Sequence, residues 1–210
     1  MDPTLELPSL QYAPVRHPNC CLSFSSKLIE ILTRMFSSTA NLDGTSTVLS
    51  IGSGSGLLEA LLLAHVEAKD DSGETSFNVE GVEVQQLSGK PPVNRYLPEQ
   101  AIYTVRGTWD VVSRLQDPDV TALMFVYPRQ PALVTEFMKA IAEQDLSIQV
   151  IVWLGPMADW DVFEPCFVAK DEHQWELEKM QGAEAGLDGY EMFVVLRRTG
   201  QVENQHISQI

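Results

Sequence analysis

The sequence has few cysteines and no long apolar run. Its three cysteines, Cys20, Cys21 and Cys166, form neither a disulfide framework nor ligand pairs at the spacing of a zinc site, so a reducing compartment is the simpler interpretation. No apolar stretch reaches the ~20 residues that a membrane span needs, and the first residues lack the basic start and apolar stretch of a secretory signal. We therefore expect a cytoplasmic protein with no metal site and no membrane partner.

Basic residues are also scarce. The sequence has 14 lysines and arginines against 29 aspartates and glutamates, which gives a formal net charge of -15. This charge repels polyphosphate backbones and anionic lipids, so nucleic acid and membrane surfaces are poor candidate partners. With 210 residues, 44% of them hydrophobic, one globular domain with one sizeable core is expected, and the oligomeric state stays open.

The chain divides into an arm, a domain and a tail. Residues 1–22 are expected to form an N-terminal arm, because the first 19 residues contain four prolines and show no clear period. Such an arm either lies on the domain surface or closes over a site. The α/β domain is expected over residues 23–200, and a short tail over 201–210.

Strand and helix patterns alternate along the domain. Buried-strand patterns occupy about 47–51, 76–84, 102–105, 120–127 and 147–154, and helical patterns about 25–36 (or from Ser23), 57–67 and 131–144, with short helical pieces near 93–100 and 109–115. Two further strands, about 174–180 and 190–198, have a glycine-containing loop and no helix between them, which predicts an antiparallel hairpin. The predicted fold class is α/β: a doubly wound, mostly parallel seven-stranded sheet with a C-terminal antiparallel hairpin.

A glycine loop follows the first predicted strand of this sheet. The loop reads Gly52-Ser53-Gly54-Ser55-Gly56 and leads into an apolar helix. Closely spaced glycines between a strand and a helix expose backbone N–H groups and the positive helix end to a ligand. A dinucleotide site prefers Gly-x-Gly-x-x-Gly, but here Leu58 occupies the later position, which disfavours a nicotinamide cofactor. A turn that serves packing alone is the alternative.

An acidic residue ends the second strand. In a doubly wound sheet, a carboxylate there can accept hydrogen bonds from both ribose hydroxyls of a nucleotide, and Glu83 stands at this point. Its distance from Gly56 exceeds the ~20 residues typical of nucleotide folds, and the insertion 70–75 accounts for the excess. Without the glycine loop, Glu83 would equally suit a solvated loop or a helix cap.

The segment Val48–Gly56 resembles the first motif of class I S-adenosylmethionine-dependent methyltransferases, and Val82-Glu83 resembles their second. The resemblance spans about residues 23–198, and the small size is similar to minimal members and to fungal proteins of biosynthetic type. It implies an S-adenosylmethionine cofactor. The residues that it places around the cofactor are Gly52, Ser53, Gly54 and Gly56 at the amino-acid portion, Glu83 at the ribose, and Thr108 and Trp109 at the adenine. Ser50 and Thr108 stand where many members carry an acid.

Candidate substrate contacts lie at the end of the fourth strand and on the arm. Tyr127 and Arg129 are expected to face the cleft, because they follow the carboxyl end of that strand. An aromatic residue and a proline are present there, but the carboxylate that amine-methylating members often keep is missing. Trp160, flanked by two aspartates, is expected to reach a pocket. Tyr12 and His17 on the arm are further candidates, with plain surface exposure as the alternative.

The expected function is methyl transfer from S-adenosylmethionine to a small, secondary-metabolite-like acceptor, chiefly by aligning acceptor and methyl group. No catalytic residue is assigned, although an O-methyl acceptor would need a base such as His17. The alternative is a methyltransferase-like protein that binds a ligand or partner, or shapes a cyclisation, without methyl transfer. Ser50, Thr108 and the missing carboxylate favour this alternative. A nicotinamide oxidoreductase is disfavoured by the glycine spacing.

Overall fold

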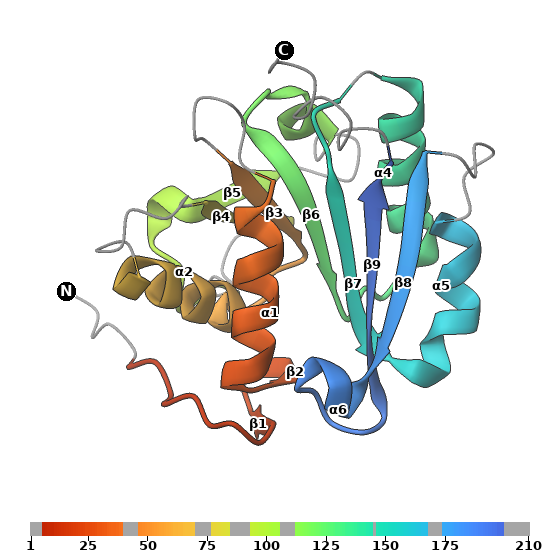
Figure 1. Cartoon of the computed structure of the whole chain (residues 1–210). Coiled ribbons are helices and arrows are strands. Elements are labelled where there is room, and N and C mark those ends of the chain that lie inside the picture. The colour runs from red at the N-terminus through yellow and green to blue at the C-terminus, as the bar shows by residue number, and fades with distance from the viewer. Residues whose placement is uncertain are drawn as a thin grey trace, which may run out of the picture.

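A seven-stranded sheet runs through the middle of the molecule, in the strand order β5-β4-β3-β6-β7-β9-β8 (Figure 1). The computed structural model describes residues 6–39, 46–69, 77–84, 93–105, 112–144, 146–167 and 174–199. The strands of this sheet are β3 (Thr47–Ile51), β4 (Asn78–Val84), β5 (Ile102–Val105), β6 (Val120–Val126), β7 (Val150–Pro156), β8 (Trp175–Gln181) and β9 (Glu191–Arg198). Neighbouring strands are parallel except at β9, which runs antiparallel to both β7 and β8.

Strand β3 lies at the centre of the sheet, and every one of its residues is buried. Its register pairs Leu49 with Glu80 of β4 and with Leu123 of β6. From β3 the chain builds β4 and β5 on one side, and then returns to build β6 and β7 on the other. The strand order therefore reverses between β3 and β6, and α/β sheets bind ligands in the crevice at the carboxyl ends of such strands.

Helices cover both faces of the sheet (Figure 1). The helices are α1 (Ser26–Ser37), α2 (Leu57–Lys69), α4 (Pro131–Glu143), α5 (Trp160–Phe167) and α6 (Gly182–Ala185), with short 3-10 helices η2 (Glu99–Ala101), η3 (Val112–Gln116) and η4 (Met157–Asp159). Helix α1 begins where its sequence predicts, since the Ser25 hydroxyl accepts the Leu28 N–H at 3.1 Å. Successive residues of β3 point to opposite faces, so Val48 joins the core with α1 and α2, and Leu49 joins the core with α4 and α5.

The α/β arrangement with a C-terminal antiparallel hairpin is confirmed, but several local predictions are wrong. Residues 93–98 form bends rather than a helix, and only η2 follows them. The sequence patterns also missed α5, which is short and contains Pro165, and the small antiparallel sheet of β1 (Val15–His17) and β2 (Cys20–Phe24). No helix was expected between the last two strands, but the four-residue helix α6 lies between β8 and β9 and is too short to show a period in the sequence. The prolines around β1 hid this second sheet, whose strand β2 buries Leu22 and Phe24 completely.

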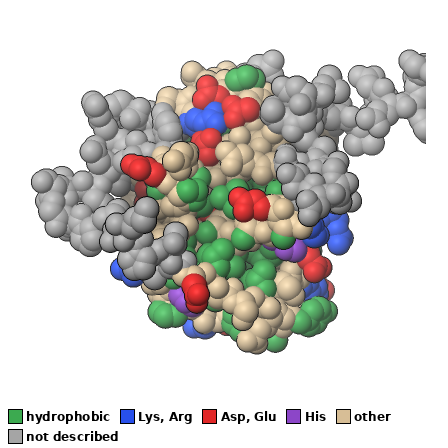
Figure 2. All heavy atoms as spheres, turned by 90° about the vertical axis from the view of Figure 1, so that its left-hand side faces the viewer, with side chains coloured by type: hydrophobic (Ala, Val, Ile, Leu, Met, Phe, Trp, Pro, Cys, Tyr) green, Lys and Arg blue, Asp and Glu red, His purple; other side chains and the backbone are tan. Residues whose placement is uncertain are grey.

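The face on the left of Figure 1 is shown from the front in Figure 2. Hydrophobic side chains gather in its middle, acidic side chains are scattered around them, and the basic side chains of the described residues form no continuous patch on it. No helix in the described part of the chain is both long enough and apolar enough to cross a bilayer.

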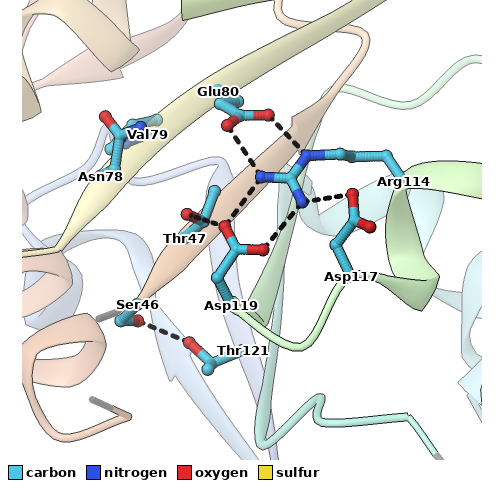
Figure 3. A network of polar contacts seen from close by, with 9 residues as sticks. All are labelled: Ser46, Thr47, Asn78, Val79, Glu80, Arg114, Asp117, Asp119 and Thr121. Atoms are coloured by element: carbon cyan, nitrogen blue, oxygen red, sulfur yellow. Dashed lines mark hydrogen bonds and ion pairs between the residues drawn. The ribbon is translucent and has the colours of Figure 1, made fainter. Parts of the chain in front are cut away.

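A charged network joins the amino ends of the central strands (Figure 3). The Arg114 guanidinium donates two hydrogen bonds to Glu80, at 3.0 and 2.9 Å, and two to Asp119, at 2.9 and 2.8 Å. It also donates to Asp117 at 2.7 Å, while the Thr47 hydroxyl donates to Asp119 at 2.8 Å. Arg114 holds the pKa of Asp119 down at about 2. These groups lie near the amino ends of β3, β4 and β6, so their contacts stabilise the end of the sheet opposite the glycine loop.

Candidate functional site

The glycine loop follows β3 and has a backbone conformation that residues with side chains rarely adopt. Gly52, Gly54 and Gly56 have φ values of 77°, 59° and 75°, all in the left-handed region. A Cβ atom added to Gly52 or Gly54 would meet no other atom within 4 Å, whereas one added to Gly56 would lie 2.4 Å from Asn94 Oδ1. The first two glycines therefore border open space, and the third is required by packing.

Glu83 faces this loop from the neighbouring strand. The Gly52 N–H donates to the Val82 carbonyl at 2.9 Å, and the Gly54 N–H donates to Glu83 Oε1. The carboxylate thus lies beside the turn, at the place that the sequence predicts. A carboxylate on the rim of an open loop at the reversal of the strand order is well placed to accept from a ligand's hydroxyl groups.

The turn between β1 and β2 closes one side of the loop. The Ser55 hydroxyl donates to the Asn19 carbonyl, and the Asn19 amide donates to the Tyr96 hydroxyl at 2.8 Å. The N–H of Arg95 donates to the Ser55 carbonyl at 2.9 Å. The N-terminal segment and the 93–97 loop are therefore both hydrogen-bonded to the glycine loop. The sequence left open whether the arm lies on the domain surface or over a site, and in the structure the arm contacts the glycine loop through Asn19.

Two adjoining cavities open at this end of the sheet. The glycine-loop cavity has a volume of about 150 Å³ and is lined by Asn19, Cys20, Cys21, Gly52, Ser53, Gly54, Ser55, Leu57, Leu58, Glu59, Val126, Tyr127 and Arg129. The outer cavity has a volume of about 390 Å³ and is lined by Cys21, Tyr127, Pro128, Arg129, Pro131, Asp159, Val162 and Phe163. Since Cys21, Tyr127 and Arg129 line both, the two cavities are neighbours across these side chains.

Tyr127 separates the cavities in a strained conformation. It has a φ of 49° although it is not glycine, and its N–H donates to the Leu154 carbonyl at 2.7 Å. Its hydroxyl donates to Glu191 Oε1 at 2.6 Å. Burial and the Glu191 carboxylate raise the pKa of Tyr127 well above its ordinary value, so this phenol stays protonated and serves as a wall, not as a base.

Glu191 is a fully buried carboxylate whose hydrogen bonds are satisfied. Besides Tyr127 it accepts from the N–H and the hydroxyl of Ser23, from the Asp188 N–H at 3.2 Å and from the Tyr190 hydroxyl at 3.1 Å. These donors come from β2, from the end of β6 and from the loop before β9. Glu191 therefore fixes Tyr127 and the N-terminal hairpin relative to the sheet.

Glu59 is a second buried carboxylate, and it lines the glycine-loop cavity. Its side chain is almost fully buried, and its Oε1 accepts from the Ser50 hydroxyl at 2.5 Å. Burial is the main cause that raises the pKa of Glu59 to about 7. Burial, and then Glu59, also raise the pKa of the Cys20 thiol to about 12, so Cys20 is protonated at neutral pH and is not a nucleophile.

The structure brings together part of the predicted site. Gly52, Ser53, Gly54, Tyr127 and Arg129 line the cavities, and Glu83 contacts the loop. Thr108 and Trp109 lie outside the described residues.

Three predicted substrate contacts are placed elsewhere. Tyr12 is 79% exposed, and neither it nor His17 is among the residues that line the two cavities. The His17 ring packs near Tyr96, and its Nδ1 accepts the Asn19 N–H at 3.2 Å. Trp160 does not reach a pocket as predicted. It is 3% exposed and stacks on Phe167 in the core, because it begins a helix that packs on the sheet.

Sequence reasoning missed Glu59, Glu191 and Asp159. Glu59 had a usable signal, since it is the one charged residue in the apolar run Leu57–Ala64, and a helix that is apolar all round is buried. Asp159 supplies a carboxylate to the outer cavity from η4, while none follows β6 directly. Cys21 was not a candidate either, but it is exposed and lines both cavities.

Comparison with known proteins places the chain in a class of fold. No protein-family model matches the sequence, and no curated protein matches it. Solved structures do match, at low sequence identity, and the likeness shows that this chain has the Rossmann-like fold found in methyltransferases.

Three such structures illustrate the match. A putative O-methyltransferase from Klebsiella pneumoniae has a TM-score of 0.53 and 11% identity, covering 83% of this chain and 79% of that one. The O-methyltransferase TomG from Streptomyces achromogenes, involved in tomaymycin synthesis and solved in complex with SAM, has a TM-score of 0.51 and 13% identity, covering 84% and 82%. An rRNA methylase from Streptococcus thermophilus has a TM-score of 0.51 and 13% identity, covering 81% and 95%.

Proposed function

We propose that this protein transfers a methyl group from S-adenosylmethionine to a small-molecule acceptor. The observation that carries the proposal is the open glycine loop, with the Glu83 carboxylate on its rim, at the point where the strand order reverses. The similarity in fold to TomG, which was solved with SAM, supports the choice of cofactor.

The residues present fit the cofactor. Gly52 and Gly54 border open space that side chains would fill, and the buried Ser53 Oγ and Glu59 Oε2 have no hydrogen-bond partner among the described residues. Open backbone and unpartnered polar atoms around one cavity are what a polar ligand needs. We infer that the glycine loop holds the amino-acid portion and that Glu83 holds the ribose.

The outer cavity is the proposed acceptor site. Its volume of about 390 Å³ lies in the ~300–1,000 Å³ range of small-molecule pockets. Its lining is mainly apolar, with Arg129 and Asp159 as the charged groups that would orient an acceptor. The net charge of -15 disfavours a nucleic-acid acceptor, although one structure of similar fold is an rRNA methylase.

The chemistry requires little of the chain. The cofactor, when bound, supplies an activated methyl group on a sulfonium, so the protein chiefly holds the acceptor in line and excludes water. Tyr127, locked by Glu191, provides a rigid wall between the two cavities. For an acceptor that must lose a proton, Asp159 is the carboxylate that lines the outer cavity, and the phenol of Tyr127 and the thiol of Cys20 stay protonated.

Calorimetric titration with S-adenosylmethionine, S-adenosylhomocysteine and NAD tests the cofactor. We expect the first two to bind and NAD not to bind, and NAD binding alone would overturn the proposal. Tritiated S-adenosylmethionine, incubated with the protein and either the low-mass fraction or the RNA of a cell extract, then tests the acceptor. Label in the low-mass fraction is expected. Label in RNA would refute the acceptor class, and binding without any transfer would favour a ligand-binding protein of the same fold.

A further inference from the structure

Glu59 is a buried carboxylate without the partners that such a group requires. It is 1% exposed, and it accepts one side-chain hydrogen bond, from Ser50. Its other oxygen, Oε2, is buried and has no hydrogen-bond partner among the described residues. Glu191, by contrast, is a buried carboxylate of the same protein that accepts hydrogen bonds from four residues. Of these two carboxylates, only Glu59 is among the residues that line the two cavities described above.

No basic side chain is paired with Glu59 among the described residues. The charged group that acts on it is Glu83 on β4, which disfavours a negative charge, and Cys20 on β2 beside it is a protonated, uncharged thiol at neutral pH. Tyr127 and Arg129 at the end of β6 line the same cavity. A carboxylate that is buried without a cation is strongly destabilising unless it is protonated or meets a cationic ligand.

The chemistry of the cavity defines the missing partner. Oε2 of Glu59 can accept from a donor inside the cavity, and a positively charged donor would also remove the cost of burying the charge. Next to it, the amino end of the 13-residue helix α2 suits an anionic group. The carboxylate of Glu59 would bind an ammonium group, and the amino end of α2 would bind a carboxylate. An amino-acid group carries both of these charges.

We propose that Glu59, held by the Ser50 hydroxyl, binds the ammonium group of the ligand's amino-acid portion and thereby selects ligands that carry this group. The inference rests on the proposed function, in which the ligand is S-adenosylmethionine. It adds a specificity determinant that comes from helix α2 and not from the loop. Its consequence is that an otherwise identical nucleoside without the amino-acid portion gains nothing from Glu59.

Two ligands separate these contributions in a calorimetric titration. S-adenosylmethionine has the amino-acid portion, and 5′-methylthioadenosine keeps the nucleoside and the sulfur but lacks it. In Glu59→Gln, we expect affinity for S-adenosylmethionine to fall at least about 30-fold, and affinity for 5′-methylthioadenosine to stay within about threefold. Glu67→Gln, on the exposed side of the same helix, is the matched control and should bind both ligands normally. The double variant Ser50→Asp/Glu59→Gln should recover part of the loss, because the two side chains touch.

The pH dependence gives a readout that a structural role would not change. Below about pH 7, Glu59 must lose a proton to bind an ammonium group, so affinity for S-adenosylmethionine should rise from pH 5.5 to 7. It should fall again above about pH 8, where an α-amino group loses its charge. Glu59→Gln should lose the acidic limb. At pH 8 and without ligand, the same variant should also melt at a higher temperature than the natural chain, because a raised pKa makes the charged form destabilising.

Each outcome decides between the two proposals. If the natural chain binds neither ligand, the proposed function falls and this inference with it. If it binds S-adenosylmethionine and Glu59→Gln binds it equally well, the function stands and the role of Glu59 is refuted. If Glu59→Gln loses both ligands to the same extent, Glu59 only supports the shape of the cavity, and the inference is again refuted.

Discussion

Replacing Gly54 by valine should abolish cofactor binding while the fold is retained. Gly54 has a φ of 59°, and a left-handed conformation costs an L residue ~1–2 kcal/mol, with a β-branched residue at the upper end. A Cβ at this position meets no atom within 4 Å, so no clash adds to this cost. For a chain of this size, the loss corresponds to a decrease in Tm of roughly 2–8 °C.

The effect on binding should be much larger than the effect on stability. The added isopropyl group would occupy space in a cavity of only about 150 Å³, on the side where the proposed ligand approaches the backbone. We expect affinity for S-adenosylmethionine to fall at least about 100-fold, which is ~2.8 kcal/mol. Calorimetric titration measures the affinity, and thermal unfolding followed by circular dichroism measures the Tm.

Gly56→Ala is the contrasting variant. Its φ is 75°, and the new Cβ would lie 2.4 Å from Asn94 Oδ1 and 2.9 Å from Leu97 Cγ. Strain and overpacking together should cost roughly 2–5 kcal/mol of stability, more than Gly54→Val costs. If Gly54→Val folded and bound S-adenosylmethionine like the natural chain, the ligand would not lie on the glycine loop, and the reasoning about open backbone would be refuted.

Other predictions address the Arg114 network, the buried carboxylate of Glu191 and the outer cavity. Arg114→Met should lower the free energy of unfolding, measured in urea, by ~2–3 kcal/mol, a loss that is limited because the partners of Arg114 are partly exposed. Ligand affinity should stay unchanged. A loss of affinity would contradict the view that the two ends of the sheet act separately. The lowered pKa of Asp119, about 2 against 3.8, means that its stabilisation is present above about pH 4 and is lost as the pH falls toward 2, and acid titration of Arg114→Met should lack this step. Glu191→Gln should cost ~2–4 kcal/mol in the same urea assay, since an amide group cannot accept from every donor around it, and a neutral result would mean that the donors rearrange freely. Val162→Trp, at a 60% exposed position, should fill the outer cavity and prevent methyl transfer with cofactor affinity intact; loss of cofactor binding would show that the cavities are not separate sites.

The fold was largely predictable, because its strongest signals are local. Thr47–Ile51 is a buried strand followed by glycines, and its limits agree with the structure to the residue. The weak predictions were short elements. Helix α5 has eight residues and an internal proline, and β1 has three residues beside prolines, so neither carries enough period to be recognised.

The candidate site was only partly predictable, because its groups meet across the sheet. The contact between Tyr127 and Glu191 joins residues 64 apart in the chain, and the one between Gly54 and Glu83 depends on the register of β3 and β4. The position of Glu83 beside the glycine loop was expected, because doubly wound sheets commonly place an acid there. No sequence pattern indicated the contact between Tyr127 and Glu191. Trp160 was misplaced because the helix that buries it was not recognised.

The sequence by itself determined the order of the longer strands and helices, the place of the glycine loop and the acidic character of the chain, since these depend on neighbours along the backbone or on composition. Only the tertiary structure decided which polar groups are buried, which of them find partners and where space remains. Glu59 and Glu191 are both single acids next to apolar residues in the sequence, yet one is saturated with donors and the other faces a cavity. The physical reason is that the cost of burying a charge depends on every group around it in space.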